Sequence, residues 1–165
     1  MKAVITTVFL LLTIQANSQS FGLSSDTNLL TYEEVIKVDG MSSEELFNKV
    51  KEWTIETFNN AEKVIVGENK PSLIKARFIQ AYFNGLGKNA DYYNTLTVRV
   101  KDGAVKITID QMVMSSGYGV EQTIFKKDGS KRKGQIYQKI HDDIESKCRD
   151  LVKNLANYMN KDPEW

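Results

Sequence analysis

The sequence predicts an α+β fold: a single two-layer domain in which a curved antiparallel sheet of about five strands carries two helices on one face. Three observations support this. Short segments between residues 29 and 114 alternate apolar and polar side chains, as half-buried strands do. Two other segments repeat apolar residues every three to four positions, as amphipathic helices do. The strands after the first helix are joined by connections short enough for antiparallel pairing, so the order β-α-β-β-β-β-α favours helices on one face.

The first 18 residues have the layout of a secretory signal peptide. Lys2 is followed by the apolar run Val8–Leu12 and by the small-residue exit Ala16-Asn17-Ser18. A membrane anchor is the alternative, but a spanning helix needs about 20 predominantly apolar residues, and polar side chains interrupt this segment. We expect cleavage after Ser18, with no lipid anchor because the junction has no cysteine. The sequence therefore predicts export to the periplasm, the cell surface or the medium, with no transmembrane helix after cleavage.

Removal of residues 1–18 leaves 147 of the 165 residues, enough for one domain. One lysine leaves with the leader, so the 22 Lys and Arg become 21, equal to the 21 Asp and Glu. A formal charge of zero removes any global attraction to a polyanion. The single cysteine, Cys148, cannot form an internal disulfide, so packing must stabilise the fold. We expect residues 19–28 to be a flexible leader, residues 29–160 to form the domain and residues 161–165 to be a tail.

The first predicted strand runs from Leu29 to Val38, with Glu34 as the one polar residue on its apolar parity. Ser42 and Glu45 follow with the spacing of a capping box, in which each satisfies a free backbone N–H of a first helical turn. They therefore predict a helix. Its apolar stripe consists of Leu46, Phe47, Val50, Trp53, Thr54, Thr57 and Phe58.

Further strands are predicted at Lys63–Val66 and from Ile74 to Phe83, followed by a loop over residues 84–91. Asp102-Gly103 then joins two more strands, and it is a strong hairpin signal because both turn positions favour positive φ. This turn fixes a register in which every opposed pair on one face is apolar. The pairs are Val100 with Val105, Val98 with Ile107 and Leu96 with Ile109.

Residues 115–135 contain several glycines and a basic cluster. A loop of this length is uncommon in a compact domain, so we expect it to be mobile, with a short edge strand near residues 120–125 as the alternative. A long helix follows from Gln135 to Met159, because apolar residues keep helical spacing throughout. The basic cluster comprises Lys126, Lys127, Lys131, Arg132 and Lys133.

Several of these residues together resemble a known family. They are the strand Tyr32–Gly40, the following Ser-x-x-Glu-Leu-Phe at Ser42–Phe47, the helix around Trp53 and the exported leader. They resemble a bacterial exported domain of unknown function that is described as having a TATA-binding-protein-like (TBP-like) fold. The likeness extends best from Leu29 to Met114 and weakens beyond it. It implies the sheet-and-helix fold, and it carries no activity, cofactor or functional residue.

No catalytic motif is found in the sequence, and we expect neither an enzyme nor a bound cofactor. His141, the only histidine, lies one helical turn from Glu145, but two ligands do not make a metal site, and a solvated helix face is the simpler interpretation. Cys148 lies about 10 Å from His141 along the helix axis, too far for a thiolate pair, so we expect a buried, inert thiol. Gly117-Tyr118-Gly119 lacks the strand-turn-helix setting of a phosphate-binding loop.

The alternation of the strands assigns a second set of side chains to the outer face of the sheet, opposite the helices. Arg99 and Lys106 are directly opposed near the hairpin turn, and the same register places Tyr93 opposite Met112 toward the other end. Lys75 also lies on this parity, so the face changes from basic to apolar. We predict a partner-binding face that comprises Phe83, Tyr93, Met112, Met114, Arg77, Arg99 and Lys106.

An apolar patch beside cations suits a protein, an anionic glycan or an anionic amphiphile. The simpler interpretation is a solvated face covered by Lys and Arg stems, with residues 115–135 over its apolar end. We do not expect nucleic acid, because export separates the chain from the genome. Two alternatives remain: an envelope enzyme without a motif, and a small-molecule or lipid carrier with a pocket between the sheet and the C-terminal helix. The carrier would use Glu34, Gln80 and Gln111, which equally mark strand ends or bulges.

Overall fold

The computed structural model describes residues 21–23, 30–58, 61–83, 89–114, 122–123, 125–126, 128 and 130–161. The predicted signal peptide, the predicted leader apart from residues 21–23, residues 115–121 of the predicted loop and most of the predicted tail lie outside these residues.

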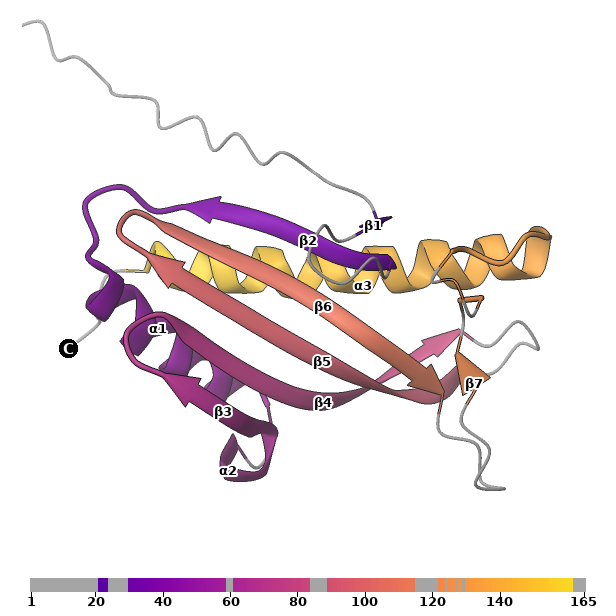
Figure 1. Cartoon of the computed structure of the whole chain (residues 1–165), viewed down its shortest axis with the longest axis horizontal. Helices are drawn as coiled ribbons and strands as arrows, with labels where there is room; N and C mark the ends of the chain where they lie inside the picture. The colour runs from indigo at the N-terminus through magenta and orange to yellow at the C-terminus, as the bar shows by residue number, and fades with distance from the viewer. Residues whose placement is uncertain are drawn as a thin grey trace, which may run out of the picture.

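The described residues form two layers (Figure 1). One layer is an antiparallel sheet with the strand order β1-β2-β6-β5-β4-β3. The short strand β7 also belongs to this sheet and pairs with β6. The helices α1 and α3 cover one face of this sheet, which confirms the predicted α+β arrangement. The elements are β1 (Gly22–Leu23), β2 (Leu30–Lys37), α1 (Ser43–Thr57), α2 (Ala61–Val64), β3 (Ile65–Asn69), β4 (Leu73–Phe83), β5 (Asn89–Lys101), β6 (Ala104–Met114), β7 (Gln122–Thr123) and α3 (Gln135–Met159).

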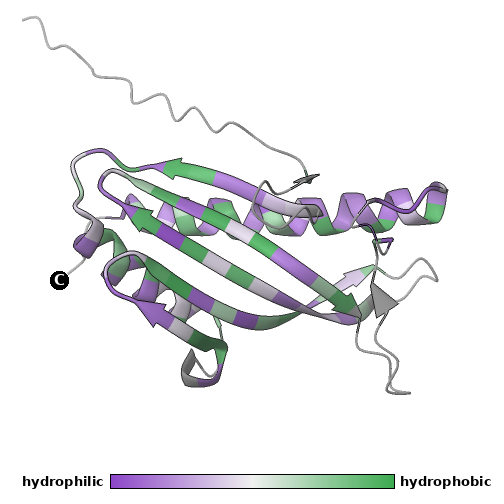
Figure 2. Cartoon of the chain, in the orientation of Figure 1, coloured by the Kyte–Doolittle hydropathy of each residue, from purple (hydrophilic) through white to green (hydrophobic). Residues whose placement is uncertain are grey.

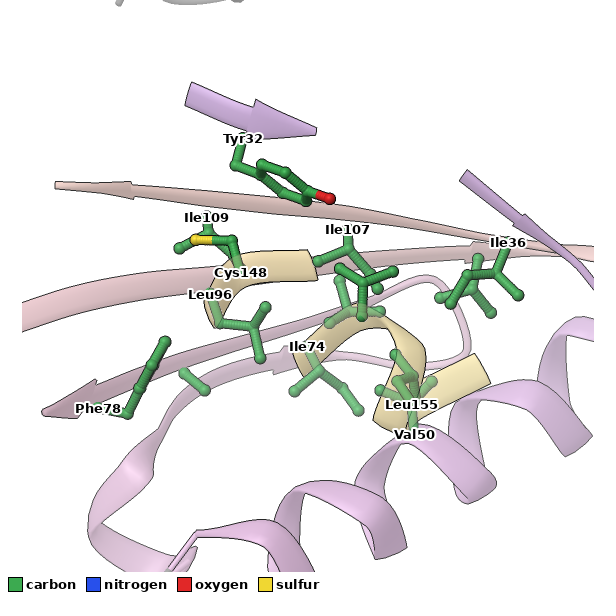
Figure 3. Packing of buried hydrophobic residues seen from close by; sticks show 14 of the residues in the cluster. Tyr32, Ile36, Val50, Ile74, Phe78, Leu96, Ile107, Ile109, Cys148 and Leu155 are labelled. Atoms are coloured by element: carbon green, nitrogen blue, oxygen red, sulfur yellow. The ribbon is translucent and has the colours of Figure 1, made fainter. Parts of the chain in front are cut away.

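The central hairpin, β5 with β6, has the predicted register. Lys101 pairs with Ala104 across the turn, and Val98 pairs with Ile107 further along the strands. Apolar and polar residues alternate along these strands, as the banding in Figure 2 shows. Leu96 and Ile107 point toward the helices, where they pack near Leu155 of α3 (Figure 3). The apolar face of the hairpin is therefore the centre of the core.

The start of α1 is tied to this hairpin. Ser42 and Glu45 form the predicted capping box: the Ser42 Oγ accepts a hydrogen bond from the Glu45 N–H at 3.3 Å, and the Ser42 N–H donates to the Glu45 Oε2 at 2.8 Å. Asp102 of the hairpin turn accepts a further hydrogen bond at 2.7 Å from the Ser43 N–H. Two of the free N–H groups of the first turn thus have partners, one of them distant in sequence.

The helices are also fixed to each other. The Trp53 indole N–H of α1 donates to the Asn154 Oδ1 of α3 at 2.7 Å, and the Lys49 ammonium donates to the backbone carbonyl of Met159 at 3.0 Å. Because both helices lie on the same side of the sheet, they bury one continuous core against it.

Two predicted boundaries differ from the structure. The strand expected at Lys63–Val66 is wrong at its start, since α2 occupies Ala61–Val64 and β3 begins at Ile65. The loop expected over residues 84–91 ends earlier, because Asn89 pairs with Phe83 as β5 begins. An edge strand does occur near residues 120–125, at Gln122–Thr123, which pairs with the end of β6.

A bulge interrupts the alternation of β6. Thr95 pairs with Asp110, but Tyr93 pairs with Val113, so Gln111 and Met112 together face the single residue Asn94. Gln111 has a φ of 54°, in the left-handed region that non-glycine residues adopt uncommonly. The extra residue reverses the facing of all residues after it, so Met112 becomes buried and Gln111 exposed.

An aromatic cluster packs Phe21 and Phe125, which precedes α3, against the core. The expectation of a flexible leader is therefore wrong at residues 21–23. Phe21 is buried, and its ring lies 5.9 Å from the Tyr32 ring and 5.7 Å from the Phe125 ring. The Lys131 ammonium lies 5.3 Å from the Phe21 ring centre. The domain therefore begins before the boundary predicted at residue 29, and Gly22–Leu23 adds a short strand to β2.

His141 belongs to the same cluster, so the expectation of a solvated surface is wrong for this residue. Its side chain is fully buried, and its imidazole stacks on the Phe125 ring with the centres 5.5 Å apart. Neither imidazole nitrogen has a hydrogen-bond partner of regular geometry within the described part of the chain. Burial lowers the pKa of His141, and the nearby Lys131 charge lowers it further, although the Arg132 backbone and Asp142 oppose this.

The bulge makes a testable prediction for two adjacent residues. Met112→Ser should lower the free energy of unfolding by about 2–4 kcal/mol, because it removes a buried thioether side chain and leaves a hydroxyl in an apolar site. Val113→Ser should cost less than about 1 kcal/mol, because Val113 lies on the outer face. Urea unfolding of both variants measures the difference. Strict alternation without the bulge requires the opposite order.

The buried imidazole predicts an acid-sensitive fold. In the unfolded chain His141 binds a proton near its ordinary pKa of 6.5, but in the folded chain only at lower pH. The stability gained by burying the neutral ring is thus fully present above pH 6.5 and is lost as the pH falls through the lowered pKa. Thermal melts over this range should show a falling melting temperature in the wild type and a flatter profile in His141→Leu. The same pH dependence in both proteins would contradict the assignment, since the chain has no second histidine.

Candidate functional site

The candidate site is the outer face of the sheet, opposite the helices, here defined by residues that the strand register places in rows across β4, β5 and β6. One row is apolar and consists of Ile79, Tyr93 and Val113. Ile79 is 59% exposed and Tyr93 is 50% exposed, while Val113 is half-buried. Three neighbouring strands therefore present one row of apolar side chains outside the core, which we call the apolar row.

Cations occupy the rows between the apolar row and the hairpin turn. Arg77 and Lys75 follow Ile79 along the same face of β4, and both are exposed. Arg99 and Lys101 are exposed near the turn. No ion pair holds these four side chains within the described part of the chain. We call these four residues the basic region.

Lys106 is the exception among the outer-face cations. It pairs with Arg99 across the ladder, as predicted, an arrangement that is unfavourable for two like charges. Its ammonium instead lies 3.2 Å from the Glu33 Oε1 on β2. The Thr108 hydroxyl donates to the same oxygen at 3.2 Å. Glu33 thus neutralises Lys106 and leaves Arg99 available to a partner.

Next to the apolar row, Arg77 shares its row with two polar residues, Thr95 and Asp110, which are unusually buried for an outer face. Thr95 is buried, and its hydroxyl donates to the Gln111 Oε1 at 3.0 Å. Asp110, paired with Thr95, is half-buried and its Oδ1 has no hydrogen-bond partner among the described residues. Burial raises the pKa of the Asp110 carboxyl, and the Lys75 charge opposes that shift.

Two of the predicted site residues do not belong to this face. The prediction that Met112 lies on the outer face is wrong. The bulge at Gln111 turns the Met112 side chain into the core, where it is 2% exposed. The prediction that Phe83 belongs to the exposed face is also wrong, because its side chain packs against the core. Its backbone N–H donates to the Asp143 Oδ2 of α3 at 2.9 Å. The backbone register pairs Met114 with Tyr92 rather than with an outer-face residue, and its side chain lies outside the described part of the chain.

Sequence reasoning missed Ile79 and Val113. The alternation of β4 could have identified Ile79, because it shares the parity of Lys75 and Arg77. Val113 could not be found in this way, since strict alternation places it on the core side of β6. Only the bulge, which has no signal in residue type at Gln111, brings Val113 beside Tyr93.

Cys148 and His141, the sequence candidates for a nucleophile and a base, have different surroundings. Cys148 is fully buried near Tyr82, and burial raises the pKa of its thiol to about 12. His141 lies in the aromatic cluster, stacked on Phe125. Within the described ranges, no three His, Cys, Asp or Glu side chains gather closely enough to hold a metal ion.

The polar residues that suggested a carrier pocket each have a local partner. Glu34 accepts a hydrogen bond from the Tyr32 hydroxyl at 2.8 Å. Gln80 accepts one from the Tyr82 hydroxyl at 3.2 Å. Gln111 is exposed at the bulge, and a bulge was the alternative to a pocket that the sequence left open for this residue. None of the helices within the described residues is both long and apolar enough to cross a membrane.

Comparisons with known proteins agree with the fold. The family model that matches, over residues 32–115, is described as a domain of unknown function (DUF4468) with TBP-like fold. A crystal structure of a DUF4468 family protein from Bacteroides ovatus ATCC 8483 superposes with a TM-score of 0.61 and 11% identity, covering 83% of this chain and 90% of that one. A comparison with curated proteins finds no match.

A second solved structure is similar. The crystal structure of a TBP-like protein from Parabacteroides distasonis ATCC 8503 superposes with a TM-score of 0.63 and 12% identity, covering 81% of this chain and 94% of that one. At these identities the structures support the fold alone. The family model spans half of the chain, from the first core strand to the end of the central hairpin, and so the chain belongs to the DUF4468 family of domains with a TBP-like fold.

Proposed function

We propose that the protein is an exported, non-enzymatic binding module that docks a partner on the outer face of its sheet. The observation that carries this proposal is the exposed apolar row, which continues across three strands beside the unpaired cations of the basic region. A partner that complements this surface presents an apolar group next to negative charge. Proteins, anionic glycans and anionic amphiphiles share this chemistry.

The geometry of the face limits the size of the partner. Arg77 lies two residues from Ile79 along β4, so its guanidinium starts from a backbone position about 7 Å from the apolar row. Arg99 lies six residues from Tyr93 along β5, a separation of about 20 Å. Arginine binds carboxylate, sulfate and phosphate groups with two parallel hydrogen bonds. A partner that reaches both arginines is therefore an extended molecule or a surface, rather than a single small anion.

Two further features support the proposal. The leader at residues 1–18 has the sequence of a signal peptide, which supports export. Cys148 and His141, the side chains most suited to nucleophilic or acid–base catalysis, are buried on α3, on the side of the sheet opposite the outer face.

The proposal predicts site-selective cross-linking. A photoreactive benzoylphenylalanine at Tyr93 should form a covalent adduct in the envelope of the native host, detected as a mass shift after purification. The same group at Ile55, an equally exposed apolar residue on α1, serves as the control for non-specific contact and should give no adduct. Adding Arg77→Glu and Arg99→Glu should reduce the Tyr93 adduct at least tenfold, because the cations hold the partner in place.

Folding controls separate loss of binding from loss of structure. The substituted side chains are exposed, so the thermal melt of each variant should stay close to that of the wild type. Equal adducts at Tyr93 and Ile55, or a Tyr93 adduct unaffected by the charge reversals, would count against the outer face as the binding site.

A further inference from the structure

The strand β2 forms one border of the sheet, and most of that border has no neighbouring strand among the described elements. The short β1 pairs only with Leu30 and Thr31, so the remainder of β2 is an open edge within the described part of the chain (Figure 1). We propose that a second copy of this chain pairs with this open edge, antiparallel and centred on Val35. The sheets of the two copies then form one continuous sheet across a two-fold axis.

The direction of the backbone groups supports this pairing. The Val38 N–H donates to the Gly103 carbonyl at 2.9 Å, toward β6. Because backbone groups alternate along an antiparallel strand, the even-numbered residues of β2 bond toward β6. The N–H and C=O groups of Glu33, Val35 and Lys37 therefore point to the open edge.

A two-fold axis at Val35 uses all of these groups. Val35 then opposes Val35 of the second copy, and Glu33 opposes Lys37 of the second copy on both sides of the axis. Each of these pairs has its backbone groups directed at the other strand, so each exchanges two hydrogen bonds. The edge is therefore complementary to itself in hydrogen bonding.

The side chains at this edge are complementary in the same register. Val35 is 47% exposed, and the pairing buries it against its own copy. Lys37 is exposed and makes no ion pair within the described residues. Glu33 uses its Oε1 for both Lys106 and Thr108, and no contact occupies its Oε2 in the described part of the chain. That oxygen is available to Lys37 of the second copy.

The opposite border of the sheet does not have these properties. There, β3 shifts register between Ile65 and Gly67, and such an irregularity interrupts the ladder that a new strand would need. Glu68 at that edge is already paired with Lys51 of α1 at 2.8 Å. The self-complementary edge is thus β2.

The dimer would also extend the outer face. Val35, Lys106 and Arg99 lie in one row across β2, β6 and β5, and the two-fold axis continues this row into the second copy. The basic surface doubles in width. The proposed dimer does not depend on the proposed function, because it rests on the edge of the sheet rather than on its face.

Proline at the axis tests the pairing. In Val35→Pro the monomer should fold, because the Val35 N–H points away from β6 and proline is tolerated at such edge positions. The dimer should be lost, because the proline removes two central hydrogen bonds and its ring occupies the axis. The matched control is Val35→Thr, which keeps the β-branched shape and the N–H and should stay dimeric. Sedimentation velocity of the protein purified after expression of the full chain with its leader measures the mass.

Charge exchange tests the register independently. Lys37→Glu and Glu33→Lys should each weaken the dimer roughly tenfold, because each change places like charges opposite one another at two symmetric positions. The double variant restores opposite charges across the axis and should bind more tightly than either single variant, but less tightly than the wild type, because the new cation at position 33 repels Lys106 of its own chain. Wild-type protein that stays monomeric at its highest soluble concentration, a dimer unaffected by Val35→Pro, or a double variant weaker than both single variants would overturn the proposal.

Discussion

The pairing of β5 with β6 is the constraint on which the rest of the structure depends. The turn at Asp102-Gly103 fixes their register, and that register sends Val98 and Ile107 to the helices. The Asp102 carboxylate also accepts a hydrogen bond from the start of α1, so the same turn that aligns two strands positions a helix far away in sequence. The opposite parity then defines the outer face. The core, the position of α1 and the candidate site therefore all depend on the strand register that this turn fixes.

Elements with strong local signals could be predicted from the sequence. The capping box at Ser42 and Glu45 and the hairpin turn depend on contacts between residues close in the chain, and the structure reproduces both. The bulge could not be predicted, because Gln111 adopts a positive φ without being glycine or asparagine. Because of this one extra residue, the side chains after it in β6 lie on the opposite face from the one that strict alternation predicts. The predicted outer-face position is therefore wrong for Met112, whereas Arg99 and Tyr93, on the neighbouring strand β5, are exposed as the alternation predicts.

The aromatic cluster was missed for a different reason. His141 lies three residues before Ile144 and seven before Cys148, which is the helical spacing of the buried residues of α3, yet its polarity and its acidic neighbours indicate a solvated face. Phe125 stacks on this imidazole and Phe21 packs on Phe125, and both residues come from segments outside the helix. Periodicity within one helix contains no information on such partners. The helix itself could therefore be predicted, whereas the burial of His141 on it could not.

Among the described residues, no helix or further strand covers the outer face of the sheet or most of its two borders, and the physical question is what occupies them. Packing of the core does not require apolar residues on the outer face, because Ile79, Tyr93 and Val113 contribute nothing to the interface with the helices. They are aligned in one row, next to cations that make no ion pair within the described residues, and packing of the core does not explain this exposed apolar area. The open edge of β2 similarly leaves three residues with backbone groups directed outward, where a bulge or a covering strand would usually protect a monomer. Face and edge are adjacent through the row of Val35, Lys106 and Arg99, so association at the edge enlarges the face without any change in the core.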